Sequence, residues 1–393
     1  MEKYFRRTWV EVDLDALRFN YGKIKEIVSP GSRIMAVVKA DAYGHGVENV
    51  VKSLSEEGCD FFAVSNLEEA LQVRGVNGEA GILILGYTPP EYAAVLAVNN
   101  ISQSLFNLDY AKKLSLEAVK HNLEVPCHIK VDTGMGRLGF VFHDSLRDIN
   151  AVEQAKEAAT LPGIYIEGAF THFSSADEEG EGENYTAAQY DLFTAFTAAL
   201  EFEGVHIPYK HCCNSAATVL HPEMHLDMVR PGVILYGLMP SDFLKGKIDL
   251  KPVLSLKSII SMCKELEEGT PVSYGRKFVT DKKMKIATVP VGYADGYPRL
   301  LSGKAQIRVG GKAVPVLGNI CMDQCMIDVT GLEAQEGMTV TVFDNDSGSP
   351  LSLDALAKTT GTINYEIACG INKRVPRVYK SGGEIVAIAD YMV

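Results

Sequence analysis

The sequence predicts an α/β protein whose N-terminal part forms a (β/α)8 TIM-like barrel and whose C-terminal part forms a mostly β domain. Eight short, apolar, β-rich runs alternate with helix-compatible stretches in the first 245 residues, which is typical of a parallel barrel. Beyond residue 245, strand-like runs are separated by glycine-containing turns. A chain of 393 residues also exceeds the size at which a single core stops growing. We therefore predict two domains, 1–245 and 246–393, with an open doubly wound sheet as the alternative to the barrel.

Periodicity places the individual elements of the predicted barrel. Residues 45–58, 66–75, 108–122 and 186–204 have apolar side chains at helical spacing. The predicted strands are 33–40, 61–66, 81–87, 102–106, 127–133, 165–173, 209–215 and 228–237.

The second domain has helical potential mainly in LSLDALAKTTG, residues 351–361. Residues 1–10 run into the β-compatible segment RRTWVEVD. Pairing of this segment with the second domain is an alternative to a place in the barrel, and the sequence leaves both open.

Composition excludes several classes of function. The 38 Lys and Arg residues stand against 50 Asp and Glu, giving a net charge of −12, which disfavours nucleic acid as a partner. No apolar core follows the basic N-terminal residues, and no run approaches the roughly 18 apolar residues that span a bilayer. We therefore expect a cytoplasmic protein without a membrane partner, whose eight cysteines stay reduced.

Two short segments contain residue types that bind metals, but neither predicts a metal site. Cys212 and Cys213 follow His211, yet no second ligand pair has zinc-like spacing. HPEMH, residues 221–225, contains Pro222 between its histidines, which disfavours a metal-binding helix. We expect no metal.

Functional residues of a parallel barrel gather at the carboxyl ends of its strands, and polar residues occur there in this sequence. Such barrels often bind a phosphate near the loops after strands seven and eight, where NSAAT and RPGVILYG lie. The strand-end residues are Lys39, Ser65, Asn66, Tyr87, Asp132, His172, Asn214, Ser215, Arg230 and Gly232.

Lys39 ends the first apolar run, in AVVKADAYGHG. A lysine buried there loses solvation as a cation, which lowers its pKa and favours a nucleophilic amine that forms a Schiff base. The alternative is a buried stem whose ammonium reaches water or Asp41. A lysine together with a phosphate pocket in one barrel mouth favours pyridoxal 5′-phosphate as the cofactor.

An ordered set of motifs extends through nearly the whole chain: AVVKADAYGHG, KVDTGMGRLGF, FTHFSSADE, NSAAT, VRPGVILYGL, VSYGR, GYADGY, GNICMDQCMIDVT and NYEI. Together they resemble the bacterial alanine racemases, two-domain pyridoxal-phosphate enzymes. The resemblance implies racemisation of L- and D-alanine, which supplies D-alanine for peptidoglycan. It also implies a homodimer whose active sites are shared across the interface, because Tyr274 and Met322 reach the site of the other subunit in that family.

The resemblance implies two catalytic bases. Lys39 matches the lysine that holds the cofactor and serves one face of the α-carbon, and Tyr274 matches the tyrosine that serves the other. Racemisation needs both, since the proton leaves one side and returns on the other. His172 and Arg230 match a cationic network that helps the tyrosine to ionise. Arg230 also faces the ring nitrogen and, because it keeps its proton, leaves that nitrogen unprotonated.

Other matched residues bind the cofactor or the substrate. Arg137 matches the arginine that binds the substrate carboxylate, and Lys130 beside it matches a lysine that is often carbamylated. The backbone of Met322, with Asp323 next to it, meets the substrate. Tyr293 and Tyr365 narrow the entrance. The cofactor and its phosphate are held by Tyr43, His172, Asn214, Ser215, Arg230, Gly232, Val233 and Tyr365.

Three other functions remain open at this point. A serine or broad-specificity racemase shares most of the motifs. A barrel-type amino-acid decarboxylase also binds the cofactor on a lysine, but an arginine against the ring nitrogen is not expected there. A non-enzymatic pyridoxal-phosphate carrier resembles the barrel alone, so the second domain with Tyr274 and Met322 argues against it.

Overall fold

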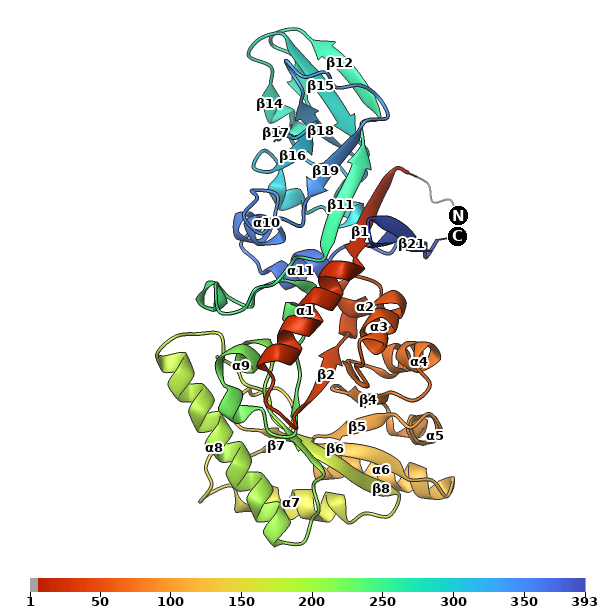
Figure 1. Cartoon of the computed structure of the whole chain (residues 1–393), viewed down its shortest axis with the longest axis vertical. Coiled ribbons are helices and arrows are strands. Elements are labelled where there is room, and N and C mark those ends of the chain that lie inside the picture. Colours follow the sequence, from red (N-terminus) through yellow and green to blue (C-terminus); the bar gives the residue numbers. More distant parts are fainter. Residues whose placement is uncertain (1–5, 393) are drawn as a thin grey trace.

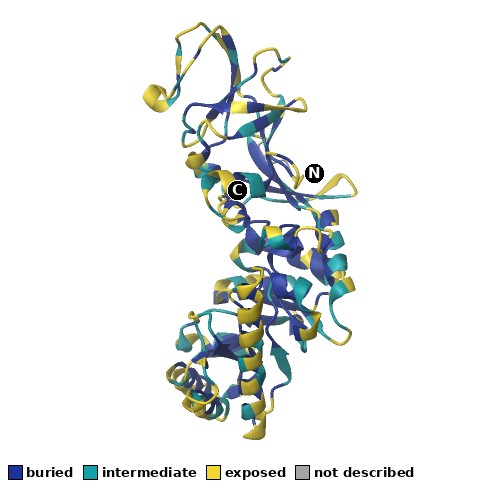
Figure 2. Ribbon diagram, turned by 90° about the vertical axis from the view of Figure 1, so that its left-hand side faces the viewer, coloured by how far each residue is buried: buried dark blue, intermediate teal, exposed yellow. Residues whose placement is uncertain are grey.

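The computed structural model describes residues 6–392. A barrel forms one end of the elongated molecule and a β-rich part forms the other (Figure 1). The predicted fold class is confirmed: parallel strands with surrounding helices come first, and a mostly β part follows. Buried residues concentrate in the strands and where the two parts meet (Figure 2).

Eight parallel strands form the barrel in the order β10-β2-β3-β4-β5-β6-β8-β9. The ring closes between its first and last strands through hydrogen bonds from Asp227 N to Lys210 O (3.1 Å) and from Arg230 N to Cys213 O (2.9 Å). The additional short strand β7, Phe140–Val141, pairs with β6. The barrel strands are β2 Arg33–Val37, β3 Phe61–Val64, β4 Gly81–Ile84, β5 Ser102–Leu105, β6 Val125–Asp132, β8 Ile164–Phe170, β9 Tyr209–His211 and β10 Met228–Val229.

Four of the eight helices around the barrel begin where a short polar side chain accepts a hydrogen bond from an N–H of the first turn. Asn66 accepts from Glu69 N and Asn107 from Tyr110 N, which satisfies N–H groups that have no partner within the helix. The barrel helices are α1 Leu14–Ile27, α3 Val47–Glu56, α4 Leu67–Val76, α5 Ala93–Val98, α6 Leu108–Lys120, α7 Ile149–Ala159, α8 Glu181–Phe202 and α9 Ser215–Leu220.

Two elements differ most from the predicted bounds. The last strand was expected over 228–237, but β10 ends at Val229 and a short 3₁₀ helix, Val233–Tyr236, follows it. Pro231 lacks an N–H for a continuing ladder, and Gly232 turns the chain. Helix α8 begins at Glu181, inside the acidic segment after His172, because acidic side chains are favourable in a first helical turn.

The C-terminal part is built on a ten-stranded sheet that also includes the N-terminal strand β1, Thr8–Asp13. Strand β1 pairs antiparallel with β11 and parallel with β20. Of the two alternatives that the sequence left open for the N-terminal segment, Thr8 to Val10 take the pairing with this part, while residues 1–5 lie outside the described residues. The other strands are β11 Leu254–Ile259, β12 Met262–Leu266, β15 Met284–Val289, β16 Gln306–Val309, β17 Lys312–Leu317, β18 Cys325–Asp328, β19 Thr339–Phe343, β20 Arg377–Ser381 and β21 Glu384–Ala389.

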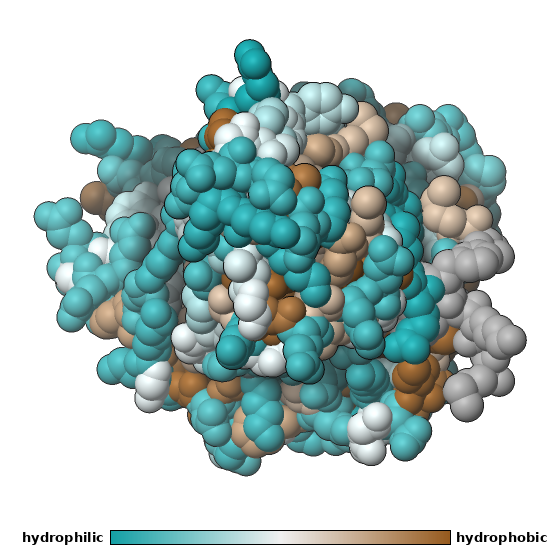
Figure 3. Space-filling view, turned by 90° about the horizontal axis from the view of Figure 1, so that it is seen from above, coloured by the Kyte–Doolittle hydropathy of each residue, from teal (hydrophilic) through white to brown (hydrophobic). Residues whose placement is uncertain are grey.

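Smaller elements complete the C-terminal part. Helix α10, Leu353–Thr360, lies in the predicted helical segment, and α11, Asn364–Cys369, packs against the barrel turn α2, Lys39–Tyr43. Strands β13, Pro271–Val272, and β14, Phe278–Val279, form a separate pair. Seen from above, this end of the molecule is mainly hydrophilic with small hydrophobic patches (Figure 3). No helix between residues 6 and 392 is both long and apolar enough to cross a membrane.

Candidate active site

A cavity of about 520 Å³ lies at the carboxyl ends of the barrel strands. It brings together most of the residues singled out in the sequence, although they come from distant parts of the chain. Tyr274, Tyr293, Met322 and Asp323 do not line it. The predicted residues that line it are Lys39, Tyr43, Lys130, Arg137, His172, Asn214, Ser215, Arg230, Gly232, Val233 and Tyr365.

Lys39 follows the end of β2 and begins the turn α2. Burial lowers the pKa of its ammonium, and the nearby Arg137 guanidinium lowers it further. The lowered pKa favours a neutral, nucleophilic amine within the cavity. The lowered pKa supports Lys39 as a nucleophilic amine over Lys39 as an ammonium that reaches water or Asp41.

The turn after Lys39 is left-handed. Ala40, Asp41, Ala42 and Tyr43 all have φ between 53° and 54°, a conformation that costs an L-residue roughly 1–2 kcal/mol each. Residues four apart in such a turn share a face, and both Lys39 and Tyr43 line the cavity. Strain concentrated beside a reactive lysine points to a functional requirement for this geometry.

Tyr43 lies where the predicted phosphate site requires a donor. Its ring packs 5.0 Å from Tyr236 and 6.1 Å from Tyr365, measured between ring centroids. A Cβ on Gly232 would lie 2.6 Å from the Tyr43 hydroxyl oxygen, so only glycine permits this approach. Burial raises the pKa of Tyr43, so the phenol stays protonated and can donate. Ser215 Oγ accepts from Gly232 N (2.9 Å) at the same edge.

Arg230 is buried and held by hydrogen bonds inside the barrel. Nη1 donates to His211 Nδ1 (2.8 Å), and Nη2 donates to Thr171 O (2.7 Å) and Cys212 O (2.9 Å). Burial lowers its pKa to about 10, so the guanidinium remains charged at neutral pH. Two of its five N–H donors have no hydrogen-bond partner among the described residues, and Arg230 itself lines the cavity.

His211, which was considered above as a metal ligand together with Cys212 and Cys213, instead accepts a hydrogen bond from Arg230. Because arginine only donates, His211 Nδ1 must accept, and its Nε2–H donates to His128 Nδ1 (2.9 Å). His128 Nε2–H in turn donates to Glu167 Oε2 (3.2 Å). Between residues 6 and 392 no group of three His, Cys, Asp or Glu residues could hold a metal ion.

The surroundings of His172 oppose the positive charge that the resemblance implies for it. It is surrounded by Arg230, Arg137, Lys130 and Lys39, and burial together with these cations lowers its pKa well below the usual value. The imidazole is therefore neutral at pH 7. Of the two members of the expected cationic network, Arg230 alone is charged.

Lys130 and Arg137 lie on one side of the cavity. Lys130 Nζ donates to Val131 O (2.7 Å), and burial lowers its pKa to about 7. Arg137 sits in the loop after β6, and Asp132 fixes this loop by accepting from Gly134 N and Gly136 N, both at 3.0 Å. The burial of several cations in one cavity favours an anionic ligand.

Tyr274, Met322 and Tyr293 lie on the surface of the C-terminal part, with 73%, 53% and 43% of their area exposed. Asn319 Nδ2 donates to Tyr274 O (2.8 Å), which ties the VSYGR segment to the Met322 loop. Their positions do not place them at the cavity of this chain. Their roles therefore stay predictions that depend on a second subunit.

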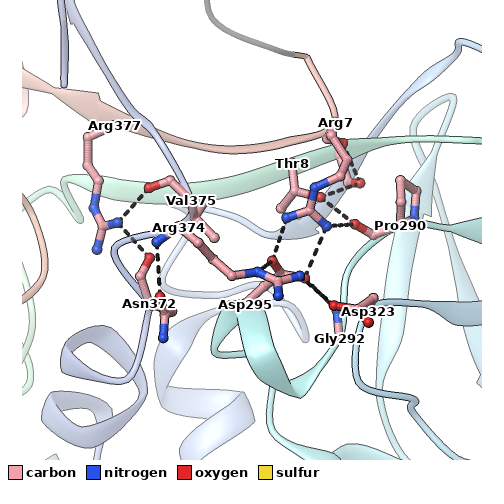
Figure 4. A network of polar contacts seen from close by, with 11 residues as sticks. Arg7, Thr8, Pro290, Gly292, Asp295, Asp323, Asn372, Arg374, Val375 and Arg377 are labelled. Carbon is pink, nitrogen blue, oxygen red and sulfur yellow. Dashed lines mark hydrogen bonds and ion pairs between the residues drawn. The ribbon is translucent and has the colours of Figure 1, made fainter. Parts of the chain in front are cut away.

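A buried carboxylate holds the segments that carry Tyr293 and Asp323 (Figure 4). Asp295 Oδ1 accepts from Arg7 Nη2 (2.5 Å) and Arg374 Nε (2.8 Å), and its Oδ2 accepts from Gly292 N (3.0 Å). Arg374 Nη2 also donates to Asp323 Oδ1 (2.6 Å). Asp295 lies within the motif GYADGY, where the residue pattern alone does not distinguish it as a structural carboxylate.

Asp295→Asn is expected to lower the free energy of unfolding by about 3 kcal/mol, because it leaves two arginines without a buried carboxylate partner. Urea unfolding measures the change. Asp281→Asn, an exposed carboxylate of the same part, is the matched control and should change stability by about 0.5 kcal/mol or less. Equal effects of the two substitutions would contradict the assignment.

Both parts of the chain match models of one protein family. Residues 12–240 match the alanine racemase N-terminal domain, and residues 253–379 match the alanine racemase C-terminal domain. The chain belongs to the alanine racemase family. The predicted boundary at residue 245 stays a prediction, because the two family matches leave 241–252 unassigned.

Individual alanine racemases match over the whole chain. The alanine racemase of Clostridium perfringens is 44% identical, with 100% of each chain covered. A solved alanine racemase from Clostridium difficile 630 has 38% identity and a TM-score of 0.93, with 100% of both chains covered. An alanine racemase structure from Bacillus anthracis with bound L-Ala-P has 35% identity and a TM-score of 0.92, covering 100% of this chain and 99% of that one. Matches in both parts favour an alanine racemase over the decarboxylase and carrier alternatives.

Proposed function

We propose that this protein racemises L- and D-alanine with pyridoxal 5′-phosphate held on Lys39, and so supplies D-alanine for peptidoglycan. Membership of the alanine racemase family supports the activity. The single structural observation that supports the proposed activity is one cavity lined by Lys39, Arg137 and Arg230, in which the pKa of Lys39 is lowered.

The residues of the cavity fit the cofactor. Tyr43, Ser215 and the backbone at Gly232 and Val233 form a small polar cradle that suits a phosphate. The unpartnered donors of Arg230 suit an unprotonated ring nitrogen. When bound, the cofactor would make the α-proton of an amino acid acidic.

The protein supplies binding and proton transfer. Arg137 offers a planar pair of donors to the substrate carboxylate. The Lys39 amine takes or returns the α-proton on one face, where its lowered pKa keeps it a competent base. Tyr274 of a second subunit serves the opposite face, with Met322 and Asp323 beside the substrate. Tyr293 of that subunit and Tyr365 limit the size of the substrate.

This proposal requires a homodimer. The exposure of Tyr274, Tyr293 and Met322 supports it, since such side chains need burial against another surface to act in a water-excluded site. The experiment that tests the function measures α-deuterium incorporation into L- and D-alanine in deuterium oxide. We expect incorporation from both enantiomers together with loss of optical rotation. Absence of exchange from either enantiomer would refute the function, and serine tested in parallel separates a narrow racemase from a broad one.

Lys130 is expected to carry a carbamate above about pH 7. Carbon dioxide reacts with a neutral amine, and the pKa of about 7 leaves much of Lys130 neutral at physiological pH, whereas protonation below that pH blocks the reaction. The resulting anion would pair with Arg137, whose charge lies close to Lys130. Native mass spectrometry in bicarbonate at pH 8 and pH 6 should show the modification at the higher pH only. The exposed Lys52, examined by peptide mapping of the same samples, should remain unmodified.

A further inference from the structure

Hydrogen bonds of three side chains surround the left-handed turn after Lys39: those of Asp41 within the turn, Tyr391 and Arg377. Asp41 Oδ1 accepts from Val47 N (2.9 Å), and its Oδ2 accepts from Tyr391 Oη (2.8 Å) near the chain's end. Arg377 Nε donates to Gly44 O (3.1 Å) from the C-terminal sheet. These contacts involve the side chain of Asp41, the second left-handed residue, or the backbone that follows the turn.

The first left-handed residue has a different partner. Ala40 N donates to Glu69 Oε1 (2.7 Å), and Ser65 N donates to Glu69 Oε2 (2.8 Å). Ala40 follows β2 and Ser65 follows β3, so one half-buried carboxylate joins the ends of two neighbouring strands. Among the residues from 6 to 392, Glu69 is the one acceptor of the Ala40 N–H.

We propose that Glu69 is a positioning residue for Lys39, whose carboxylate bridges the N–H groups of Ala40 and Ser65 and holds the left-handed turn that presents Lys39 and Tyr43 to the cavity. Ala40 has a Cβ and therefore resists the left-handed conformation that glycine adopts freely. Two charge-assisted hydrogen bonds at its start oppose relaxation of the turn. The effect of Glu69 on catalysis rests on the proposed function, whereas its stabilisation of the turn does not.

The same carboxylate is poorly replaced by an amide. Glutamine at position 69 has one oxygen acceptor, and its NH₂ group would face a backbone N–H that also donates. At least one of the two strand-end amides thus loses its partner, while the side chain keeps its size. Glu68 is the neighbouring residue in the first turn of α4 and is exposed, so Glu68→Gln removes the same charge from the same helix end without touching the turn.

The test uses the full-length protein saturated with pyridoxal phosphate and two readouts that do not depend on turnover. Hydrogen exchange resolved to single amides follows the N–H groups of Ala40 and Ser65. Dilution with absorbance detection follows release of the cofactor. In Glu69→Gln we expect at least one of these amides to exchange about tenfold faster or more, and the cofactor to leave about tenfold faster. Glu68→Gln should change neither rate by more than about twofold.

A rescue variant separates positioning from simple charge. Adding Ala40→Gly to Glu69→Gln removes the left-handed penalty without restoring the carboxylate, so cofactor retention should recover to within about threefold of wild type. Failure of this rescue, or equal effects of Glu69→Gln and Glu68→Gln, would overturn the proposal. If Glu69→Gln does not fold, Glu69→Asp takes its place, because the shorter side chain reaches at most one of the two amides. A wild-type protein that binds no pyridoxal phosphate would refute the proposed function, while amide exchange still decides the role of Glu69.

Discussion

Replacing Lys39 by alanine is expected to lower racemisation of alanine by at least about a thousandfold, because in the proposed mechanism Lys39 is both the covalent anchor of the cofactor and one of the two bases. Loss of the amine should also abolish the visible absorbance of lysine-bound pyridoxal phosphate. Racemisation is measured from both enantiomers, and cofactor binding is measured by absorbance after dialysis.

The matched control for this substitution is Lys52→Ala, which removes an exposed lysine of the next helix. It should leave both measurements near wild type. A Lys39→Ala protein that still held the cofactor covalently would show that another amine is the anchor. Lys130 would be the first residue to examine, because it lines the same cavity and has a pKa of about 7.

Tyr274→Phe is expected to reduce racemisation by about a hundredfold to ten-thousandfold while leaving the absorbance of the bound cofactor unchanged. In the proposed mechanism the ionised phenol is the base for one face of the substrate, and its loss removes no contact of the cofactor cavity in this chain. Tyr165→Phe, at an exposed position near the opposite end of the barrel, is the control. If Tyr274→Phe fails to bind the cofactor, the assignment of two bases is wrong.

Mixing the two inactive variants tests whether the site is shared between subunits. In a heterodimer of Lys39→Ala and Tyr274→Phe, one of the two sites would contain both wild-type residues and the other would contain neither. Random reassociation of symmetric dimers then predicts recovery of about a quarter of wild-type activity. Recovery of no activity after verified exchange of subunits would place both bases in the same chain.

The sequence was most informative for strands that are buried on both faces of the sheet. Strand β3, with the sequence FFAV, has every residue buried, so it is a continuous apolar run that is easily recognised. The rule that function gathers at carboxyl ends of strands then located Lys39, Arg230 and Ser215, which the structure brings to one cavity. Resemblance of motifs supplied Arg137 and Tyr365, whose positions in loop and helix follow no such rule.

Other features depend on contacts between distant strands and could not be predicted from periodicity. The lowered pKa of His172 arises from its burial and from four cations that come from different parts of the barrel. His211 reaches Arg230 and His128 only because β9 lies between their strands in space. Glu69 cannot be distinguished by sequence from Glu68 beside it. The segment ADAY, residues 40–43, contains no glycine that would predict its left-handed conformation.

Strand β1 lies between β11 and β20 in the C-terminal sheet, although it precedes the entire barrel in the chain. During synthesis this strand emerges first and has no sheet to join until β11 and β20 have been made. Its contacts are therefore among the most distant in sequence, and the sheet can be completed only after β20 and β21 have been made. A fragment comprising residues 246–393 alone would leave two unpaired strand edges facing a gap, and we expect it to aggregate unless residues 8–13 are supplied as a peptide.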